Sequence, residues 1–184
     1  KLFSDSFAAY PDYAQMFHDA ASEGRDGKGT ILVFAAGNDR GLRNTNDLNL
    51  TNSLYGITVA GINAQTDLSS LVIGPKPFST QGETILVSAP GSNIVSTGQI
   101  LQSSTGTVFG SDYQAASGTS LAAPIVSGIA ALMLEANPNL GYRDVQDILA
   151  YSARRVNDPT TSWQTNLATN WNGTGLHYSR DYGF

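Results

Sequence analysis

The chain has 184 residues, of which 41% are hydrophobic, so it is long and apolar enough for one domain around one sizeable core. Only 14% of the residues are charged and the net charge is −5, which argues against a nucleic-acid-binding face and a polybasic membrane patch. The absence of Cys excludes disulfides, thiolate metal sites and a cysteine nucleophile.

The first third of the chain has the pattern of an α/β unit. Residues 11–23 carry apolar side chains at helical spacing, and Gly24 is placed to end a helix there. After a turn over 27–29, residues 30–36 form a continuous apolar run that is rich in β-branched side chains. Such a run predicts a central parallel strand that is covered on both faces.

The middle of the chain predicts further strands over residues 57–61, 84–89 and 94–96. Residues 97–116 are rich in Ser, Thr and Gly, and they predict a surface loop or an edge hairpin. Together with the first unit, these segments indicate an α/β fold.

Two helices of different character are predicted in the last third. From Ser120 to about Glu135 the sequence is apolar almost all round, which predicts a helix buried on every side. From about Gly141 to Ala153 the apolar residues share one face, which predicts an amphipathic helix. The longest apolar run is too short for a membrane span, and the tail after Asn157 shows no clear periodicity.

A turn of small residues opens the apolar helix and places a serine at its mouth. The run reads Gly118-Thr119-Ser120-Leu121-Ala122-Ala123-Pro124. One interpretation of Ser120 is an ordinary helix N-cap, because Ser and Thr are preferred at that position. The other is a nucleophile on a rigid helix, which needs a neighbouring base and hydrogen-bond donors for the oxyanion of acyl transfer.

A candidate oxyanion donor, Asn38, follows the predicted strand over 30–36. Ligands of open α/β sheets bind beyond the carboxyl ends of the strands, where the Asn38 amide would project. The alternative is that Asn38 forms an Asx turn before Asp39 and Gly41.

These segments together resemble the subtilisin-like serine proteases. The nucleophile motif of that family is Gly-Thr-Ser-x-Ala-Ala-Pro, which residues 118–124 match, and its oxyanion asparagine lies in a strand-end Gly-Asn, as Gly37-Asn38 does. Further segments are similar to the family or to its kexin and furin branch: Phe78-Ser79-Thr80-Gln81-Gly82, Val87-Ser88-Ala89-Pro90-Gly91, Thr51-Asn52-Ser53-Leu54-Tyr55, Leu134-Glu135-Ala136-Asn137 and Tyr182-Gly183-Phe184.

The resemblance implies a three-layer α/β fold with a mostly parallel sheet flanked by helices. It implies that residues 1–184 are the C-terminal portion of one subtilisin-like peptidase domain and that the activity is that of a serine endopeptidase. In that role Ser120 Oγ would attack the peptide carbonyl, and the Asn38 amide with the Ser120 main-chain N–H would hold the oxyanion. The substrate-binding residues that the resemblance implies are Ala35, Ala36, Gly37 and Thr119.

The Asp and His of a catalytic triad are not recognisable in the chain. In family order they precede the oxyanion asparagine, in Asp-x-Gly and His-Gly-Thr motifs. The chain has two histidines, His18 and His177, and neither stands in such a motif. We therefore expect the upstream half of the domain as a partner, and inactivity of this chain alone.

Several alternatives are open at this point. The chain is a fragment of a larger catalytic domain, one chain of a nicked enzyme, or a non-catalytic pseudo-protease that binds proteins. A weaker alternative is an unrelated α/β ligand-binding domain.

The resemblance also bears on ligands and location. The chemistry requires no cofactor, and structural Ca²⁺ is consistent with the family although Thr80 stands where a Glu ligand is expected. Substrates are expected to be peptides or proteins. Basic or apolar specificity stays open, because Asp47 is displaced by one position from the expected acidic residue. The implied location is extracellular or in the cell envelope.

Overall fold

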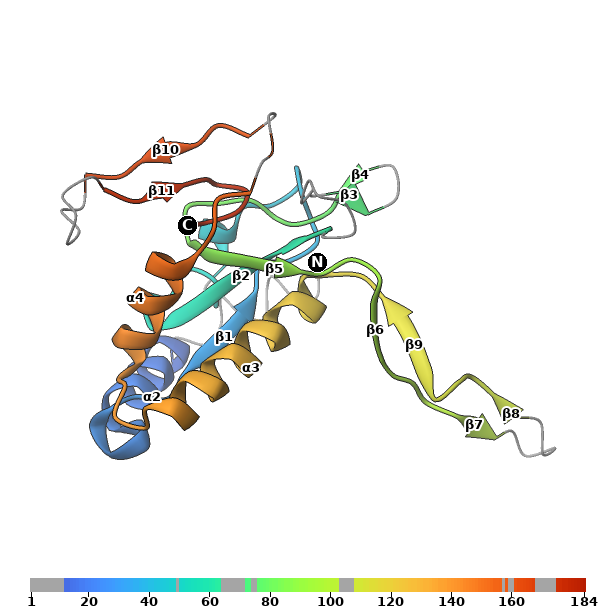
Figure 1. The fold of residues 1–184 in the computed structure, drawn as a ribbon, viewed down its shortest axis with the longest axis horizontal. Coiled ribbons are helices and arrows are strands. Elements are labelled where there is room, and N and C mark those ends of the chain that lie inside the picture. Colours follow the sequence, from blue (N-terminus) through green and yellow to red (C-terminus); the bar gives the residue numbers. More distant parts are fainter. Residues whose placement is uncertain are drawn as a thin grey trace.

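The body of the molecule is a parallel sheet packed against helices, and a β-ribbon projects from it (Figure 1). This computed structural model describes residues 12–48, 50–63, 72–73, 76–102, 108–156, 158, 161–167 and 175–184. The helical elements are α2 (Asp12–Gly27), the 3-10 turn η1 (Thr45–Asp47), α3 (Thr119–Ala136) and α4 (Tyr142–Ser152). The strands of the body are β1 (Leu32–Ala35), β2 (Gly56–Ile62), β3 (Val72–Ile73), β4 (Lys76–Pro77) and β5 (Ile85–Pro90). The ribbon contains β6 (Ile94–Thr97), β7 (Leu101–Gln102), β8 (Val108–Phe109) and β9 (Tyr113–Ala116), and a C-terminal hairpin contains β10 (Gln164–Thr165) and β11 (His177–Tyr178).

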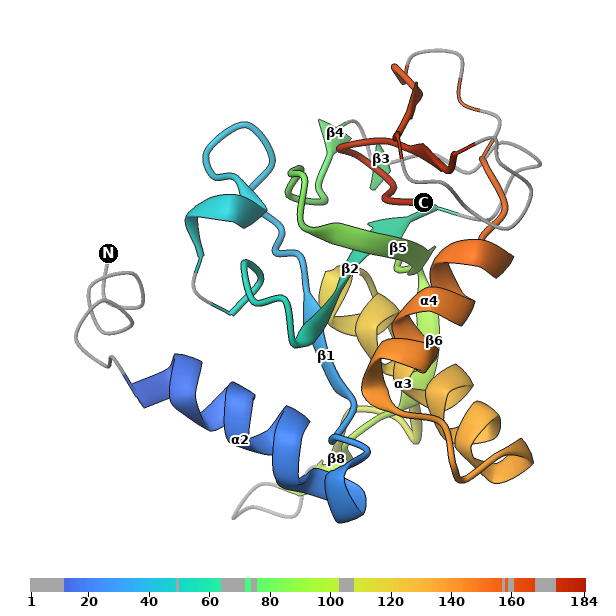
Figure 2. The same cartoon turned by 90° about the vertical axis from the view of Figure 1, so that its left-hand side faces the viewer.

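Side chains of the sheet alternate between two covered faces. Within the described residues the sheet has the order β1-β2-β5, and both pairings are parallel. Val33 of β1 and Ile57 of β2 pack in one cluster with Val126 of α3. Phe34 points to the opposite face, where its ring centroid lies 5.3 Å from that of Phe17 on α2. Helices α3 and α4 thus cover one face and α2 the other, which confirms the three-layer α/β fold (Figure 2).

Most of the predicted elements are confirmed. The regular part of α2 ends at Glu23, because Gly24 leaves helical geometry with φ −58° and ψ 146°. The three predicted strands in the middle of the chain correspond to β2, β5 and β6, and the described residues within 97–116 contribute antiparallel pairs to the predicted edge hairpin. The short pairs β3–β4 and β10–β11 were not predicted, since two-residue strands carry no readable periodicity.

Within the described residues, the first strand is not central as predicted. Strand β1 lies at one edge of the described part of the sheet, and its residues are only partly buried. Strand β2 takes the central position and is buried along nearly its whole length. The apolar run correctly indicates a strand that needs cover on both sides, but it does not specify which segment supplies the neighbour. Among the described residues, the outer edge of β1 has no strand beside it.

The prediction that the Ser120 helix is buried on every side is also wrong. Ala122, Val126 and Ala130 are buried against the sheet. On the other side of α3, Ile129 is 42% exposed and Leu132 is 65% exposed. Because α3 is apolar on all of its faces, each face is expected to pack against other residues. The described residues pack against one side of the helix only.

By length and composition, α3 is also the one described helix that could cross a membrane, with a mean hydropathy of 1.5 over 18 residues. It contacts β1, β2 and β5 along the sheet. This is the packing of a core helix in a layered α/β domain.

Candidate functional site

The start of α3 presents Ser120 to solvent. The helix begins at Thr119, Gly118 is the capping residue, and Ser120 is exposed in the first turn. The interpretation of Ser120 as an N-cap is therefore wrong. Gly118 occupies that position with φ 152°, and a Cβ there would lie 3.3 Å from Asn38 Nδ2. A glycine at this position lets the loop of Asn38 approach the helix end closely.

Asn38 lies directly beside this helix start, after the carboxyl end of β1. Its Oδ1 accepts hydrogen bonds from the Thr119 main-chain N–H at 2.9 Å and from Thr119 Oγ1 at 3.1 Å. These two bonds occupy the amide oxygen from a residue that lies far along the chain, so Asn38 does not form the Asx turn considered as an alternative. With Oδ1 held in this way, the amide Nδ2 is the end of the side chain that points away from Thr119.

Two donors near Ser120 are free to bind an anionic oxygen. No described residue accepts a hydrogen bond from Asn38 Nδ2. The Ser120 main-chain N–H lies in the first turn of α3, where N–H groups have no acceptor within the helix. The positive end of the helix dipole at this terminus also favours negative charge. An amide N–H and a main-chain N–H at a helix start are the components of an oxyanion hole.

Thr119 holds the loop of Gly37 and Asn38 in position through its side-chain hydroxyl. It is fully buried, and its Oγ1 accepts a hydrogen bond from the Gly37 main-chain N–H at 3.1 Å while donating to Asn38. Gly37 has φ 100°, a conformation that favours glycine, and a Cβ there would lie 2.9 Å from Thr80 Oγ1. The position of Thr119 therefore suits alignment of the Asn38 loop rather than direct contact with a substrate.

The remaining predicted pocket residues differ in exposure. Ala36 is fully buried and clusters with Ala60 and Ile85. Ala35 and Gly37 are partly exposed. Of these three residues, only Ala35 and Gly37 have exposed surface that could contact a bound substrate side chain.

Neither histidine contacts Ser120. His18, on α2, lies near Asp19, and its ring packs edge-on against Tyr55 at 5.7 Å. His177, on β11, lies 3.2 Å from Thr165 Oγ1. Among the described residues, no side chain hydrogen-bonds the Ser120 hydroxyl, so this part of the chain supplies it with no general base.

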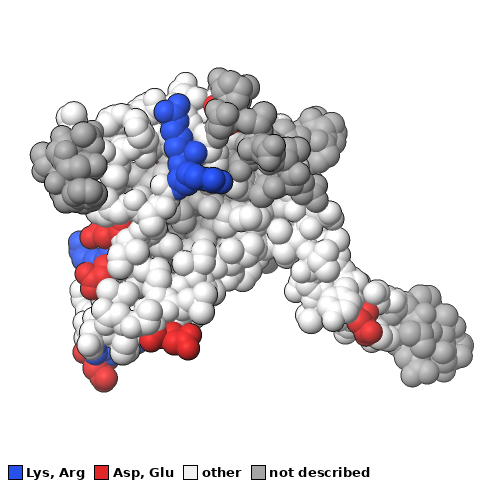
Figure 3. All heavy atoms as spheres, viewed as in Figure 1, with Lys and Arg blue, Asp and Glu red and all other residues white. Residues whose placement is uncertain are grey.

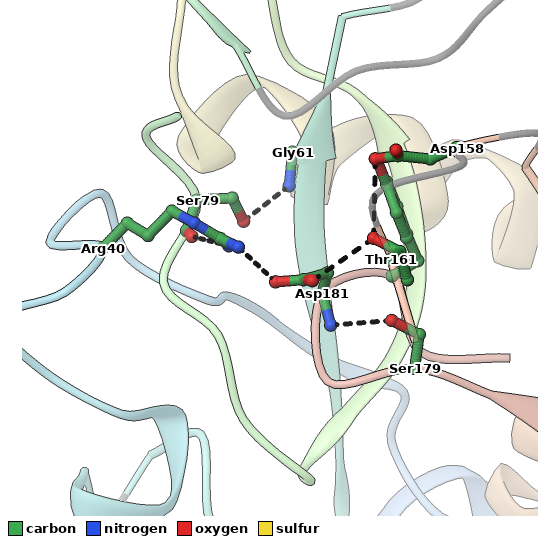
Figure 4. Close-up of polar contacts among 8 residues, drawn as sticks. Arg40, Gly61, Ser79, Asp158, Thr161, Ser179 and Asp181 are labelled. Atoms are coloured by element: carbon green, nitrogen blue, oxygen red, sulfur yellow. Dashed lines mark hydrogen bonds and ion pairs between the residues drawn. The ribbon is translucent and has the colours of Figure 1, made fainter. Parts of the chain in front are cut away.

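Two buried residues that the sequence did not indicate, Thr80 and Ser79, hydrogen-bond the Asn38 loop and the neighbouring strand β2. Thr80 is buried, its Oγ1 accepts from the Asp39 main-chain N–H at 3.0 Å, and its own N–H donates to the Gly37 carbonyl at 2.9 Å. Ser79, also buried, accepts from the Gly61 main-chain N–H at 3.1 Å (Figure 4). The family segment over 78–82 was the only available signal, and it did not indicate this function.

The C-terminal turn reaches the same loop through an ion pair. Arg40 donates to Asp181 Oδ1 at 2.5 Å and to the Ser79 carbonyl at 3.3 Å (Figure 4). Asp181 Oδ2 accepts from the Thr161 hydroxyl at 3.3 Å. The loop that carries Asn38 is thereby fixed to residues far away in the sequence.

Next to this pair, the Tyr182 hydroxyl donates to Asp158 Oδ2 at 2.5 Å. Burial raises the pKa of Tyr182 well above its usual range, and the hydrogen bond to the Asp158 carboxylate raises it further. The Tyr182 ring stacks on Trp163 with centroids 5.9 Å apart. This side chain is a neutral structural anchor for the turn.

Replacing Arg40 with Met should lower the free energy of unfolding by about 1.5–3 kcal/mol, since a mostly buried charged hydrogen bond is lost and Asp181 is left without its cation. Arg43→Met is the matched control. The Arg43–Asp39 pair is longer, at 3.9 Å, and more exposed, so its loss should cost less than about 1 kcal/mol. Urea unfolding of the full-length protein measures both variants, and equal losses would contradict a special role of the Arg40 pair.

Within the described residues, no group of three or more His, Asp or Glu side chains could hold a metal ion. The described residues therefore give no support to a Ca²⁺ site, and no step of the chemistry below depends on one.

Comparisons with known proteins identify the family. The sequence model of the subtilase family matches residues 1–184. Kexin from Saccharomyces cerevisiae is 36% identical over 167 residues, which are 89% of this chain and 18% of kexin. Human proprotein convertase subtilisin/kexin type 7 is 34% identical over 169 residues, which are 88% of this chain and 19% of that protein.

Solved structures are similar in fold. The serine protease of Aeromonas sobria matches with a TM-score of 0.68 and 22% identity, over 92% of this chain and 37% of that chain. A protease from Pseudoalteromonas arctica matches with a TM-score of 0.59 and 25% identity, over 80% of this chain and 41% of that chain. The chain spans about a fifth of the length of the curated relatives named above. By the match of its whole length, it belongs to the subtilase family.

Proposed function

We propose that this chain is the nucleophile-bearing part of a serine endopeptidase domain. The observation that carries the proposal is the joint position of Ser120 and Asn38 at the start of α3, with Asn38 Oδ1 fixed by Thr119 and Nδ2 left to donate. Family membership supports the same activity.

In the proposed reaction, Ser120 Oγ forms a bond to the carbonyl carbon of a peptide, and its proton passes to a histidine base. The carbonyl oxygen becomes an oxyanion, which accepts hydrogen bonds from Asn38 Nδ2 and the Ser120 main-chain N–H. Collapse of this intermediate breaks the C–N bond, and the base returns the proton to the leaving amine. Water then hydrolyses the acyl-enzyme by the same steps and restores the Ser120 hydroxyl.

The base and its orienting aspartate are proposed to come from a segment N-terminal to this chain, as family order places them. Two exposed surfaces support a partner of this kind. The outer edge of β1 has no neighbour within the described sheet, and Ile129 and Leu132 on α3 leave an apolar face uncovered. A strand beside β1 and a helix against α3 would cover both surfaces and bring the missing side chains to Ser120.

This proposal is tested by complementation. The chain alone should not cleave a fluorogenic peptide library, whereas the chain co-expressed with the upstream segment of the same protein should cleave it. Leu132→Asp should reduce the recovered activity, because a charge on the uncovered face of α3 would oppose docking of the segment. A complemented protein that binds peptides without cleaving them would instead support the pseudo-protease alternative.

Three further expectations belong to the same proposal. Peptides or proteins are the substrates, and an extracellular or cell-envelope location follows from the family resemblance. Structural Ca²⁺ elsewhere in the complete domain remains an expectation of that resemblance.

A further inference from the structure

The ribbon that precedes the nucleophile is an isolated arm. It lies within residues 94–117, and in its described parts, 94–102 and 108–117, β6 pairs with β9 and β7 pairs with β8, both antiparallel. Figure 1 shows it extending away from the body of the molecule. The surface of its described part is almost without charge in Figure 3, and the sequence of the arm contains a single charged residue, Asp112.

The exposed edges of the arm lack the residues that usually prevent a strand edge from pairing with another chain. Strand β9 is exposed along its whole length, and Tyr113 and Val95 are 68% and 65% exposed. In the described residues, neither β6 nor β9 has a strand on its outer edge. Exposed edges are normally blocked by Lys, Pro or a bulge, and residues 94–117 contain neither Lys nor Pro. A two-stranded ribbon of this kind gains stability when a third strand is added.

The base of the arm is joined to the candidate site. The Gly118 main-chain N–H donates to the Gly91 carbonyl at 2.7 Å, and the Asn93 N–H donates to Ser117 Oγ at 2.8 Å. Strand β9 ends at Ala116, and Ser120 follows after Ser117, Gly118 and Thr119. The exposed edge of β9 therefore leads directly to the nucleophile.

We propose that the outer edge of β9 binds an extended polypeptide substrate as an additional strand, beyond the residues held at Ser120 itself. Main-chain hydrogen bonds to β9 would be independent of substrate sequence, and Tyr113 would pack against an apolar substrate side chain. A polypeptide substrate is favoured over a second copy of the chain, because β9 ends only four residues before the candidate nucleophile Ser120. The inference rests on the proposed function and deepens it: it predicts a preference for long, unfolded substrates.

The test uses the full-length protein with a shortened arm, in which an Asn-Gly turn replaces residues 95–115 and thereby removes nearly all of β9. This turn connects Ile94 to Ala116, which lie opposite each other in the β6–β9 pair. The point variant Tyr113→Thr removes the aromatic ring and places in β9 a β-branched residue, which suits a strand. Leu167→Thr is the matched control, since Leu167 is 98% exposed next to the β10 strand and away from the arm.

Two substrates share one cleavable core sequence. The short one ends in a fluorogenic amide at the cleaved bond, and the long one extends about eight residues on each side. The shortened arm should lower kcat/KM for the long substrate about tenfold, the effect of losing a few main-chain hydrogen bonds, and leave the short substrate unchanged. Tyr113→Thr should act in the same direction with a smaller effect, and Leu167→Thr should change neither.

An equal fall on both substrates, or no fall on the long one, would overturn the proposal. A change in oligomeric state on size exclusion without a change in kcat/KM would overturn it in favour of a second copy. Failure of the unmodified protein to cleave the short substrate would count against the proposed function instead. In that case, fluorescence anisotropy with Ser120→Ala protein and the labelled long peptide tests peptide binding by the arm without cleavage. Affinity for the peptide should fall when the arm is shortened. An unchanged affinity would contradict the proposal.

Discussion

Replacing Ser120 with Ala in the complete protein should abolish peptide hydrolysis, with a loss in kcat of about 10⁶, the size established for the nucleophile of subtilisin. The substitution removes the attacking oxygen and leaves the rest of the site in place. Ser120 is exposed, and none of the described residues hydrogen-bonds its hydroxyl, so the fold should not depend on it. The circular dichroism spectrum and the unfolding midpoint should therefore stay unchanged.

Ser152→Ala is the matched control for this change. Ser152 also lies on a helix, at the end of α4, and its hydroxyl donates to the Leu149 carbonyl within that helix. Its loss should leave kcat unchanged, since Ser152 lies at the end of a different helix, and should change the free energy of unfolding by less than about 0.5 kcal/mol. Retention of hydrolysis by Ser120→Ala would show that another group is the nucleophile.

Replacing Asn38 with Leu should lower kcat by about 10²–10³ and leave KM nearly unchanged. This is the loss known for the corresponding asparagine of subtilisin, and leucine keeps the approximate size of the side chain while removing both its N–H donor and the Oδ1 that accepts from Thr119. The interaction is made with the oxyanion and not with the ground-state carbonyl, so the effect belongs in kcat. Steady-state kinetics on the short fluorogenic peptide separate the two constants.

Asn139→Leu is the control for Asn38→Leu, since it makes the same chemical change in the exposed connection between α3 and α4. It should leave both kinetic constants unchanged. A rise in KM at constant kcat for Asn38→Leu would mean that Asn38 holds the substrate and does not stabilise the transition state. A large fall in stability would point to its hydrogen bonds with Thr119 as its main contribution.

Ser120 and Asn38 could be singled out from the sequence as candidate site residues because short contiguous motifs carry them. The backbone at a helix start and at a strand end is determined largely by the nearest residues, so Gly118 and Gly37 were already informative. The contact between the two motifs also followed from topology, since the carboxyl end of a parallel strand and the start of the next helices meet at one edge of the sheet.

The supporting residues of the site could not be predicted in the same way. Arg40 and Asp181 are separated by 141 positions, and no periodicity or local motif brings them together. Thr80 was considered only as a substitute for an expected calcium ligand, whereas its hydroxyl accepts from the loop of Asn38. Contacts of this kind depend on the full three-dimensional arrangement.

The burial of α3 and β1 was predicted from their apolar sequences. An apolar sequence indicates which surfaces need to be buried, but not which residues bury them. The apolar circumference of α3 and the apolar run of β1 are properties of the sequence. The exposure of Leu132 and the unpaired edge of β1 show that part of the cover is not among the described residues. These differences are the structural basis for proposing a partner segment.

Labelling with a fluorophosphonate probe, followed by mass spectrometry of the modified peptide, tests the central claim most directly. We expect no labelling of this chain alone, labelling of Ser120 once the upstream segment is present, and loss of the label in Ser120→Ala. Modification of a different residue in the complemented protein, or no modification at all, would contradict the claim that Ser120 is the nucleophile of a serine endopeptidase.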